Sequence, residues 1–361
     1  MPLSCTLYCH CAYAGVLPAG VRTAAMNQLC SDGGAFLAVD DLCGLAAERA
    51  DIAGCAGPGS AVVACHERAV RNLTRWAYGW EPARVLDMRQ TASAKLVSQL
   101  ADLSCEASAG QPNQAALIAD IPQLPPDRPA VLVYEGPQTA AIEPGRLAEL
   151  ASALLAKGFW VFRPGIGRPV SGDAARWIVV GCFMSSQPRG AGLGPAGHVF
   201  DASRGTIEEL VTAAQAAATE LGQERIVLTP PWFPVIDERL CNNCGQCKGF
   251  CLFGVYDKPE GRIRVTNPRK CKPNCPACAR VCPAGAIIFP KFDKAPINGG
   301  CVDVAAAPGE TDLNKVLQGD VYAALRRRDG QVGPLPSTDQ LTRAIEERRR
   351  CARGSEADVN E

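Results

Sequence analysis

Residues 241–251 read CNNCGQCKGFC, and residues 271–283 read CKPNCPACARVCP. The cysteines of the first stretch are separated by two, two and three residues, and those of the second by three, two and three. Three closely spaced thiolates on one loop can surround one iron–sulfur cluster, while the fourth cysteine reaches the neighbouring cluster. The spacing therefore predicts two [4Fe–4S] clusters. The first would use Cys241, Cys244, Cys247 and Cys282, and the second would use Cys251, Cys271, Cys275 and Cys278.

A pair of four-cysteine zinc sites fits this spacing poorly, because such sites pair two separated knuckles. The two halves also repeat, since CLFGVY at 251–256 matches CPAGAI at 282–287. On these motifs, residues 234–292 resemble the bacterial two-[4Fe–4S] ferredoxin family. The resemblance implies a βαββαβ domain and one-electron transfer at low potential. Two features depart from the family pattern: Leu252 stands where proline is common, and three residues follow Cys271 before the next cysteine.

Charge, cysteine content and hydropathy indicate which classes of protein and partner fit this chain. The chain has 361 residues, and its 37 basic residues balance 37 acidic ones, which argues against nucleic acid or a charged membrane surface as a partner. Nineteen cysteines in a chain of this size favour metal or redox chemistry over disulfides. No apolar run reaches about 18 residues, and the first residues lack a secretory signal pattern. We therefore expect a cytoplasmic protein without a membrane span.

The domain organisation follows from the alternation of short apolar runs with helical patterns. This alternation occupies residues 1–105 and again residues 129–231, and it predicts βαβ units with parallel sheets. Residues 106–128 are rich in proline, alanine and glutamine and are interpreted as a linker. We predict an α/β protein with two small parallel-sheet domains, a ferredoxin-like α+β dicluster domain at 232–300, and a helical tail at 301–361.

The tail contains two helical patterns. An apolar stripe runs from Leu313 to Leu325, and residues 337–350 form the second pattern. Ser337 and Gln340 could form a capping box at the start of the second helix.

Cysteines follow three predicted strands of the first domain. One strand ends at Cys9, the second ends shortly before Cys43, and the third ends at Cys65. Because the carboxyl ends of parallel strands meet at one edge of a sheet, we expect these thiols and Cys11 to converge. All four would suffice for a third iron–sulfur cluster, whereas a smaller set with histidine would suit zinc. Thiol redox chemistry and simple packing are the alternatives.

The other residues of this cysteine-rich domain are expected to play supporting parts. His10 and His66 would hydrogen-bond to ligands rather than bind metal themselves. Four further cysteines would pack as small apolar side chains: Cys5, Cys30, Cys55 and Cys105.

Three stretches of this domain carry a second, more distant likeness. YCHCAYAG at 8–15, DDLCGLA at 40–46 and VVACHERAV at 62–70 resemble the N-terminal segment of the flavin-bearing subunit of heterodisulfide reductase. The resemblance implies an iron–sulfur site in the segment and a partner in a flavin-based electron-transfer assembly. The flavin domain of that family has no counterpart here, so its catalytic function is not implied.

The sequence thus predicts an iron–sulfur electron-transfer protein or subunit that relays single electrons through two [4Fe–4S] clusters. The relay could extend to the N-terminal cysteine site within a heterodisulfide-reductase-like complex, with a flavoprotein or such a complex as the redox partner. The alternative is a thiol/disulfide oxidoreductase whose N-terminal cysteines receive electrons from the ferredoxin domain. We expect a component of an oxidoreductase rather than a stand-alone enzyme.

Overall fold

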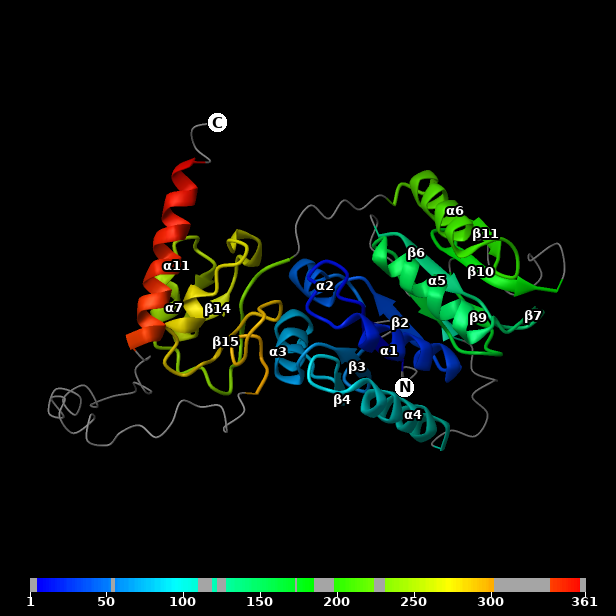
Figure 1. The fold of residues 1–361 in the computed structure, drawn as a ribbon, viewed down its shortest axis with the longest axis horizontal. Helices are drawn as coiled ribbons and strands as arrows, with labels where there is room; N and C mark the ends of the chain where they lie inside the picture. Colours follow the sequence, from blue (N-terminus) through cyan, green and yellow to red (C-terminus); the bar gives the residue numbers. More distant parts are fainter. Residues whose placement is uncertain are drawn as a thin grey trace, which may run out of the picture. The chain divides into compact units, whose positions relative to one another are not determined.

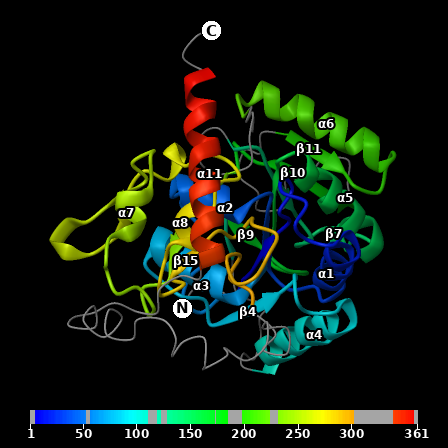
Figure 2. The same ribbon diagram turned by 60° about the vertical axis from the view of Figure 1, so that its left-hand side comes forward.

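The fold is that of a computed structural model, and it separates into two compact units (Figures 1 and 2). These units are Met1–Pro230 and Pro231–Glu361. The described residues are 5–52, 56–109, 119–121, 128–172, 174–184, 198–223, 231–301 and 338–357.

The first unit alternates strands with helices, as the sequence predicts. Its first half contains β1 (Thr6–Cys9), α1 (Ala19–Ser31), β2 (Phe36–Val39), α2 (Leu42–Glu48), β3 (Ala61–Ala64), α3 (Glu67–Tyr78), β4 (Arg84–Asp87) and α4 (Ser93–Ala109). Its second half contains β5 (Ala119–Asp120), β6 (Ala130–Val133), β7 (Thr139–Ala140), α5 (Pro144–Ala156), β8 (Trp160–Arg163), β9 (Val170–Ser171), β10 (Ile178–Phe183), β11 (His198–Asp201) and α6 (Ile207–Glu220).

The two halves share one sheet, although the sequence predicts two small sheets. The strand order is β11-β10-β6-β8-β2-β1-β3-β4, and β7 pairs with β10. Neighbouring strands along this order pair parallel within each half, but β2 and β8 pair antiparallel where the halves meet, and the added β7 pairs antiparallel with β10. Every residue of β2 and β8 is buried. A buried strand edge must find hydrogen-bond partners, which explains why the halves join instead of forming separate domains. The α/β class itself is confirmed.

The segment interpreted as a linker is partly built into this unit. Within it, β5 pairs with β9, and Ile121 is buried. Arg128, at its end, has no exposed side-chain surface and lies 3.4 Å from Asp40 and 2.8 Å from Glu48. Such a buried ion pair needs both partners, so the end of this segment is anchored to the first half of the sheet.

Helices cover both faces of the sheet. The helix α1 contacts α4 and α5, and α5 contacts α6, whereas α2 contacts α3. The chain moves from β1 to β2 and then returns across β1 to β3. Because crossovers of this kind are right-handed, α1 covers one face, and α2 and α3 cover the other. The strand order therefore reverses at β1, and the carboxyl ends of β1 and β3 flank the point where ligands gather in open α/β sheets.

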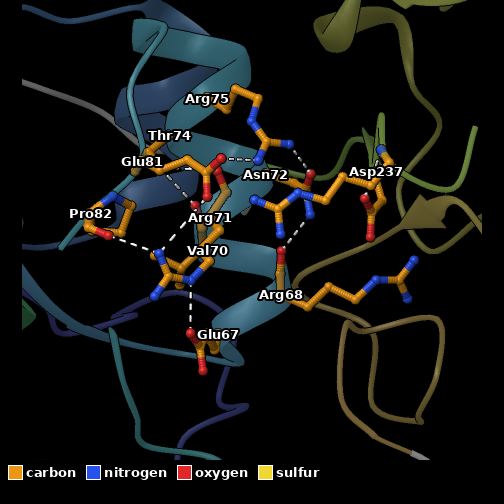
Figure 3. Close-up of polar contacts among 11 residues, drawn as sticks. Glu67, Arg68, Val70, Arg71, Asn72, Thr74, Arg75, Glu81, Pro82 and Asp237 are labelled. Atoms are coloured by element: carbon orange, nitrogen blue, oxygen red, sulfur yellow. Dashed lines mark hydrogen bonds and ion pairs between the residues drawn. The ribbon is translucent and has the colours of Figure 1, made fainter. Parts of the chain in front are cut away.

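Helix α3 begins directly after β3 and is tied to the following loop by a polar network (Figure 3). Arg71 lies 2.7 Å from Glu67 and donates a hydrogen bond to the carbonyl of Pro82. Arg75 pairs with Glu81. These contacts fix the helix whose first turn adjoins Cys65 and His66.

The second unit has the predicted βαββαβ order. Its elements are β12 (Val235–Ile236), α7 (Gln246–Phe250), β13 (Tyr256–Asp257), β14 (Arg264–Val265), α8 (Ala277–Arg280) and β15 (Ile287–Ile288), with single 3-10 turns at Pro259–Gly261 and Pro268–Lys270. Strand β12 pairs antiparallel with β15, and β13 pairs antiparallel with β14. Each half of the unit thus contributes one cysteine loop followed by one short helix and one strand, as the internal repeat predicts.

The helical tail is represented by α11 (Thr338–Ala357), which packs on α8 and is red in Figures 1 and 2. Ala344 has no exposed surface, and Arg280 donates a 2.8 Å hydrogen bond to Glu347. The predicted stripe at 313–325 and Ser337 of the capping box lie outside the described residues. None of the helices in the described parts of the chain combines the length and apolar character that a membrane crossing requires.

Candidate metal centres

The cysteines of the second unit line two separate hollows. The first hollow is lined by Cys241, Cys244, Cys247 and Cys282. The second is lined by Cys251, Cys271, Cys275 and Cys278. Each set therefore contains three thiols from one loop and one from the other, which is the grouping that the spacing predicts. The hollows enclose about 320 and 390 Å³, including solvent at their mouths.

Left-handed backbone turns bring the three thiols of each loop to one side. Asn243 and Asn274 each precede the second cysteine of their loop, with φ of 58° and 59°. Asparagine tolerates this conformation better than most side chains. The side chain of Asn243 also accepts a 2.9 Å hydrogen bond from the amide of Ile263, which ties the first loop to the residue before β14. Asn274 stands in the same place as Asn243, directly before the second cysteine of its loop. The extra residue after Cys271 therefore lies before this left-handed turn.

The fourth thiol of each hollow arrives by way of a short helix. Cys251 directly follows α7, and Cys282 follows α8 by one residue. Each helix begins within the loop that lines one hollow and delivers its last cysteine to the other. Each short helix thus spans the distance that brings the fourth cysteine of one loop to the hollow of the other loop.

The thiols within a hollow influence one another electrostatically. Burial raises the pKa of Cys247 to about 12, and the neighbouring Cys282, Cys241 and Cys244 contribute to the rise. Burial also raises the pKa of Cys278, as do Cys271, Cys251 and Cys275. Thiolates crowded in this way are unfavourable unless a cation joins them. The donor sets therefore fit a positively charged metal core bound by thiolates.

Hydrogen bonds to sulfur are already present in both hollows. The Tyr256 hydroxyl donates to Cys278 Sγ at 3.0 Å, and the Ala286 amide donates to Cys282 Sγ at 3.3 Å. Such donors stabilise negative charge on a ligand sulfur. Nowhere in the described residues do three or more His, Cys, Asp or Glu side chains form a group that could hold a single metal ion.

The N-terminal thiols lie where the strand order of the sheet reverses. Cys9 ends β1 and Cys65 directly follows β3. Burial raises the pKa of Cys65 to about 12, and Cys11 contributes to the rise. Burial also raises the pKa of Cys9, followed by the effects of Cys11 and Asp41. The structure therefore brings Cys9, Cys11 and Cys65 within electrostatic reach of one another.

Cys43 stands at the same edge of the sheet, in the first turn of α2. The amide of the preceding Leu42 donates a 3.3 Å hydrogen bond to Cys9 Sγ, so α2 begins against the β1 thiol. Cys43 is buried. Cys11 has a φ of 51°, a left-handed conformation that costs energy for a side chain of this type and often marks functional sites.

The described contacts of the two histidines are to Asp87 and Tyr8, not to the candidate ligand cysteines that the sequence predicts as their partners. His66 Nδ1 lies 3.0 Å from an Asp87 carboxylate oxygen, and His10 Nδ1 lies 3.4 Å from the Tyr8 hydroxyl. Burial lowers the pKa of His10 to about 4, and Arg22 contributes to this effect. The imidazole of His10 is therefore neutral near pH 7.

The remaining cysteines of the first unit are only partly covered by the described residues. Cys5 and Cys30 are buried, as predicted for packing side chains. Cys55 and the side chain of Cys105 lie outside the described residues.

Several residues at these sites carry no sequence signal of their own. Tyr256 donates to Cys278 from 22 positions away, Asp87 contacts His66 from 21 positions away, and Arg348 lines a hollow from α11. The repeat of CLFGVY and CPAGAI could have drawn attention to Tyr256, because its counterpart Ile287 lines the other hollow. Arg348 belongs to an arginine run that the sequence presents as an exposed helix end.

Comparison with known proteins supports one part of this picture. No protein-family model matches the chain. Over 72 residues the chain is 43% identical to an uncharacterized ferredoxin of Methanocaldococcus jannaschii. The similarity covers 20% of this chain and 48% of that ferredoxin, so the chain spans about half the length of the curated relative. The chain therefore contains a ferredoxin-like region, which supports an iron–sulfur electron-transfer role.

Proposed function

We propose that this chain is a cytoplasmic iron–sulfur protein or subunit that relays single electrons through two [4Fe–4S] clusters. Cys241, Cys244, Cys247 and Cys282 would hold one cluster, and Cys251, Cys271, Cys275 and Cys278 would hold the other. When bound, such clusters accept and donate one electron at a time. The observation that carries the proposal is the sorting of eight cysteines into two four-thiol hollows.

The protein's own residues would set the conditions of this transfer. The two loops would hold three thiols of each cluster, and the buried strands β12 and β15 pack beneath them. Tyr256 and the Ala286 amide stabilise charge on individual sulfurs. The chain would serve as a component of a larger oxidoreductase, in keeping with the bacterial ferredoxin likeness of residues 234–292.

We further propose that Cys9, Cys11, Cys43 and Cys65 form a third metal site, most simply an iron–sulfur cluster. Burial raises the pKa of Cys9 and Cys65, and Cys11 adds to the rise at both, as neighbouring thiols do in the two hollows. A redox partner such as a flavoprotein, or a heterodisulfide-reductase-like complex, would exchange electrons with this end of the protein.

The test is anaerobic iron and sulfide analysis with EPR on the full chain. Two cubane clusters would contain about eight irons and three would contain about twelve. Cys244→Ala should remove or convert one cluster, and Cys9→Ala should lower the iron content only if the third site holds a cluster. Cys30→Ala is the matched control, because Cys30 is buried but not placed in any of the three sites. Full iron content in Cys244→Ala would contradict the proposed ligation.

The second candidate function is a thiol/disulfide oxidoreductase, which the closeness of Cys9, Cys11 and Cys65 favours. In that case two of these thiols would form a disulfide and receive two electrons and two protons on reduction. Alkylation of the reduced N-terminal thiols would then stop turnover while the iron content stayed at about eight. A third cluster would instead protect these thiols from alkylation until the metal is removed.

A further inference from the structure

The two hollows of the ferredoxin-like unit differ in the charge of their linings. Lys272 and Arg348 line the hollow of Cys251, Cys271, Cys275 and Cys278. The lining of the other hollow contains no Lys, Arg, Asp or Glu among the described residues. Each set has three thiols from one loop and one from the other, and the charge of the lining is one clear difference between them.

Arg348 reaches its hollow from the far end of the chain. It lies on α11, and its guanidinium stands 5.0 Å from the centre of the Phe250 ring, one residue before Cys251. The helix is held there by buried Ala344 and by the Arg280–Glu347 contact, whose side chains are 17% and 13% exposed. Because both partners of this ion pair are largely buried, the contact fixes the position of α11 better than a surface pair would.

A hydrogen bond from Tyr256 is a second difference between the two hollows. Its hydroxyl donates a 3.0 Å hydrogen bond to Cys278 Sγ. In the other hollow the described donors to sulfur are backbone groups: the Ala286 amide lies 3.3 Å from Cys282 Sγ, and Asn243 and Lys248 make backbone hydrogen bonds to Cys241 and Cys247.

Charges near the first hollow offset one another. Glu238, three residues before Cys241, pairs with Arg264 at 2.7 Å. Lys258 does not line the hollow, and its Nζ lies 3.9 Å from the position that a Cβ on Gly245 would occupy. None of these three charged side chains lines this hollow, whereas two cations line the other.

We infer that the centre held by Cys251, Cys271, Cys275 and Cys278 has the higher reduction potential of the two, and that Arg348 of α11 helps to raise it. Cations and hydrogen-bond donors favour the reduced, more negative state of a nearby cluster. An electron entering the unit would pass from the centre of Cys241, Cys244, Cys247 and Cys282, which is oxidised by one electron, to the other centre, which is reduced. This inference rests on the proposed function.

The test is an anaerobic redox titration followed by EPR, on the full chain at low ionic strength. The wild-type protein should be reduced in two steps. Arg348→Gln should lower the upper step and leave the lower step in place, with a roughly tenfold shift of the equilibrium between the two singly reduced forms, which is about 59 mV for one electron. Tyr256→Phe should lower the same step.

Two further variants separate charge from structure. Arg348→Lys keeps the positive charge and should keep most of the upper potential. Arg349→Gln removes an equal charge from an exposed neighbour that lines neither hollow, and it should leave both steps unchanged. Iron and sulfide content is measured on every sample. A chain without clusters would refute the proposed function. Clusters present with unchanged potentials in Arg348→Gln, or with a shift of the lower step, would refute only the inferred difference in potential.

Discussion

Arg128 offers the sharpest test of how the first unit is held together. Its side chain has no exposed surface, and neither has that of Asp40, its partner at 3.4 Å. The guanidinium also pairs with Glu48 at 2.8 Å and lies 5.0 Å from the centre of the Trp160 ring. Arg128→Met keeps much of the apolar volume but removes the charge, so a carboxylate loses its cation inside the protein.

The expected cost follows from what remains around Asp40. Removing one partner of a buried ion pair costs about 3–5 kcal/mol. Asp40 keeps hydrogen bonds from the Tyr13 hydroxyl at 2.8 Å and from Trp160 Nε1 at 3.2 Å. Glu48 is 29% exposed and can recover water. We therefore expect the lower end of the range, about 3 kcal/mol of unfolding free energy.

The measurement is urea unfolding followed by tryptophan fluorescence and circular dichroism. Four of the five tryptophans lie in the first unit, so fluorescence reports mainly on it: Trp76, Trp80, Trp160 and Trp177. With a slope of about 3 kcal/mol per molar urea, the midpoint should fall by about 1 M. Arg204→Met is the control, because Arg204 is 85% exposed in its pair with Asp201 and should cost less than about 1 kcal/mol.

The outcome that contradicts this reasoning is a loss in Arg128→Met no larger than in Arg204→Met. The double variant Asp40→Asn with Arg128→Met adds a second check. It removes the carboxylate that the single variant leaves without a cation, so it should be more stable than the sum of the two single losses implies. Strict additivity would show that the pair is not coupled.

Three further changes should each produce a defined loss of stability. Gly181→Ala should cost about 1–3 kcal/mol in urea unfolding, because a Cβ there would lie 2.6 Å from the Tyr134 carbonyl oxygen; an unchanged midpoint would mean that the strands separate easily. Thr206→Ala removes the side-chain cap of α6 and should cost about 1 kcal/mol, with Thr206→Ser restoring most of it. For Asp87, burial alone would raise the pKa, but hydrogen bonds from His66 and nearby backbone amides outweigh it and lower the pKa. Its stabilising effect is therefore present above the carboxyl pKa of the unfolded chain, about 3.9, and is lost as pH falls through the lowered value; Asp87→Asn should flatten this acid limb of the stability profile.

The cysteine spacing anticipates the hollows well, because ligands within one loop are near in sequence. The order of elements in both units is also predictable, since apolar periodicity encodes strands and helices locally. What spacing and periodicity do not encode is which strand edges meet. The pairing of β2 with β8 depends on burial of both strands, and it turns two expected sheets into one.

Contacts between distant segments are also beyond the reach of local patterns. Arg280 and Glu347 are 67 positions apart, and Arg128 and Asp40 are 88 apart. Both arginines resemble ordinary surface residues in the sequence: one closes the end of a proline-rich segment, and the other precedes the last cysteine of the motif. Their partners become apparent only after the chain has folded.

The cause of the raised pKa differs among the buried cysteines of the first unit. Burial raises the pKa of Cys30 to about 12 without any contribution from another cysteine. At Cys9 and Cys65, by contrast, other thiols add to the effect of burial, as they do at Cys247. At Cys9 and Cys65 other cysteines thus stand close enough to act on the thiol, whereas at Cys30 burial and Glu135 raise the pKa.

The raised pKa values also bear on the choice between a metal site and a thiol/disulfide oxidoreductase for the N-terminal thiols. A nucleophilic thiol needs surroundings that lower its pKa. The surroundings of Cys9 and Cys65 raise it instead, and Arg89 only partly offsets the effect at Cys65. Metal binding would reverse the balance, because thiols deprotonate on ligation and release protons. Anaerobic reconstitution of the full chain should therefore release more protons than that of Cys9→Ala, and equal release from both would leave the thiols as packing side chains.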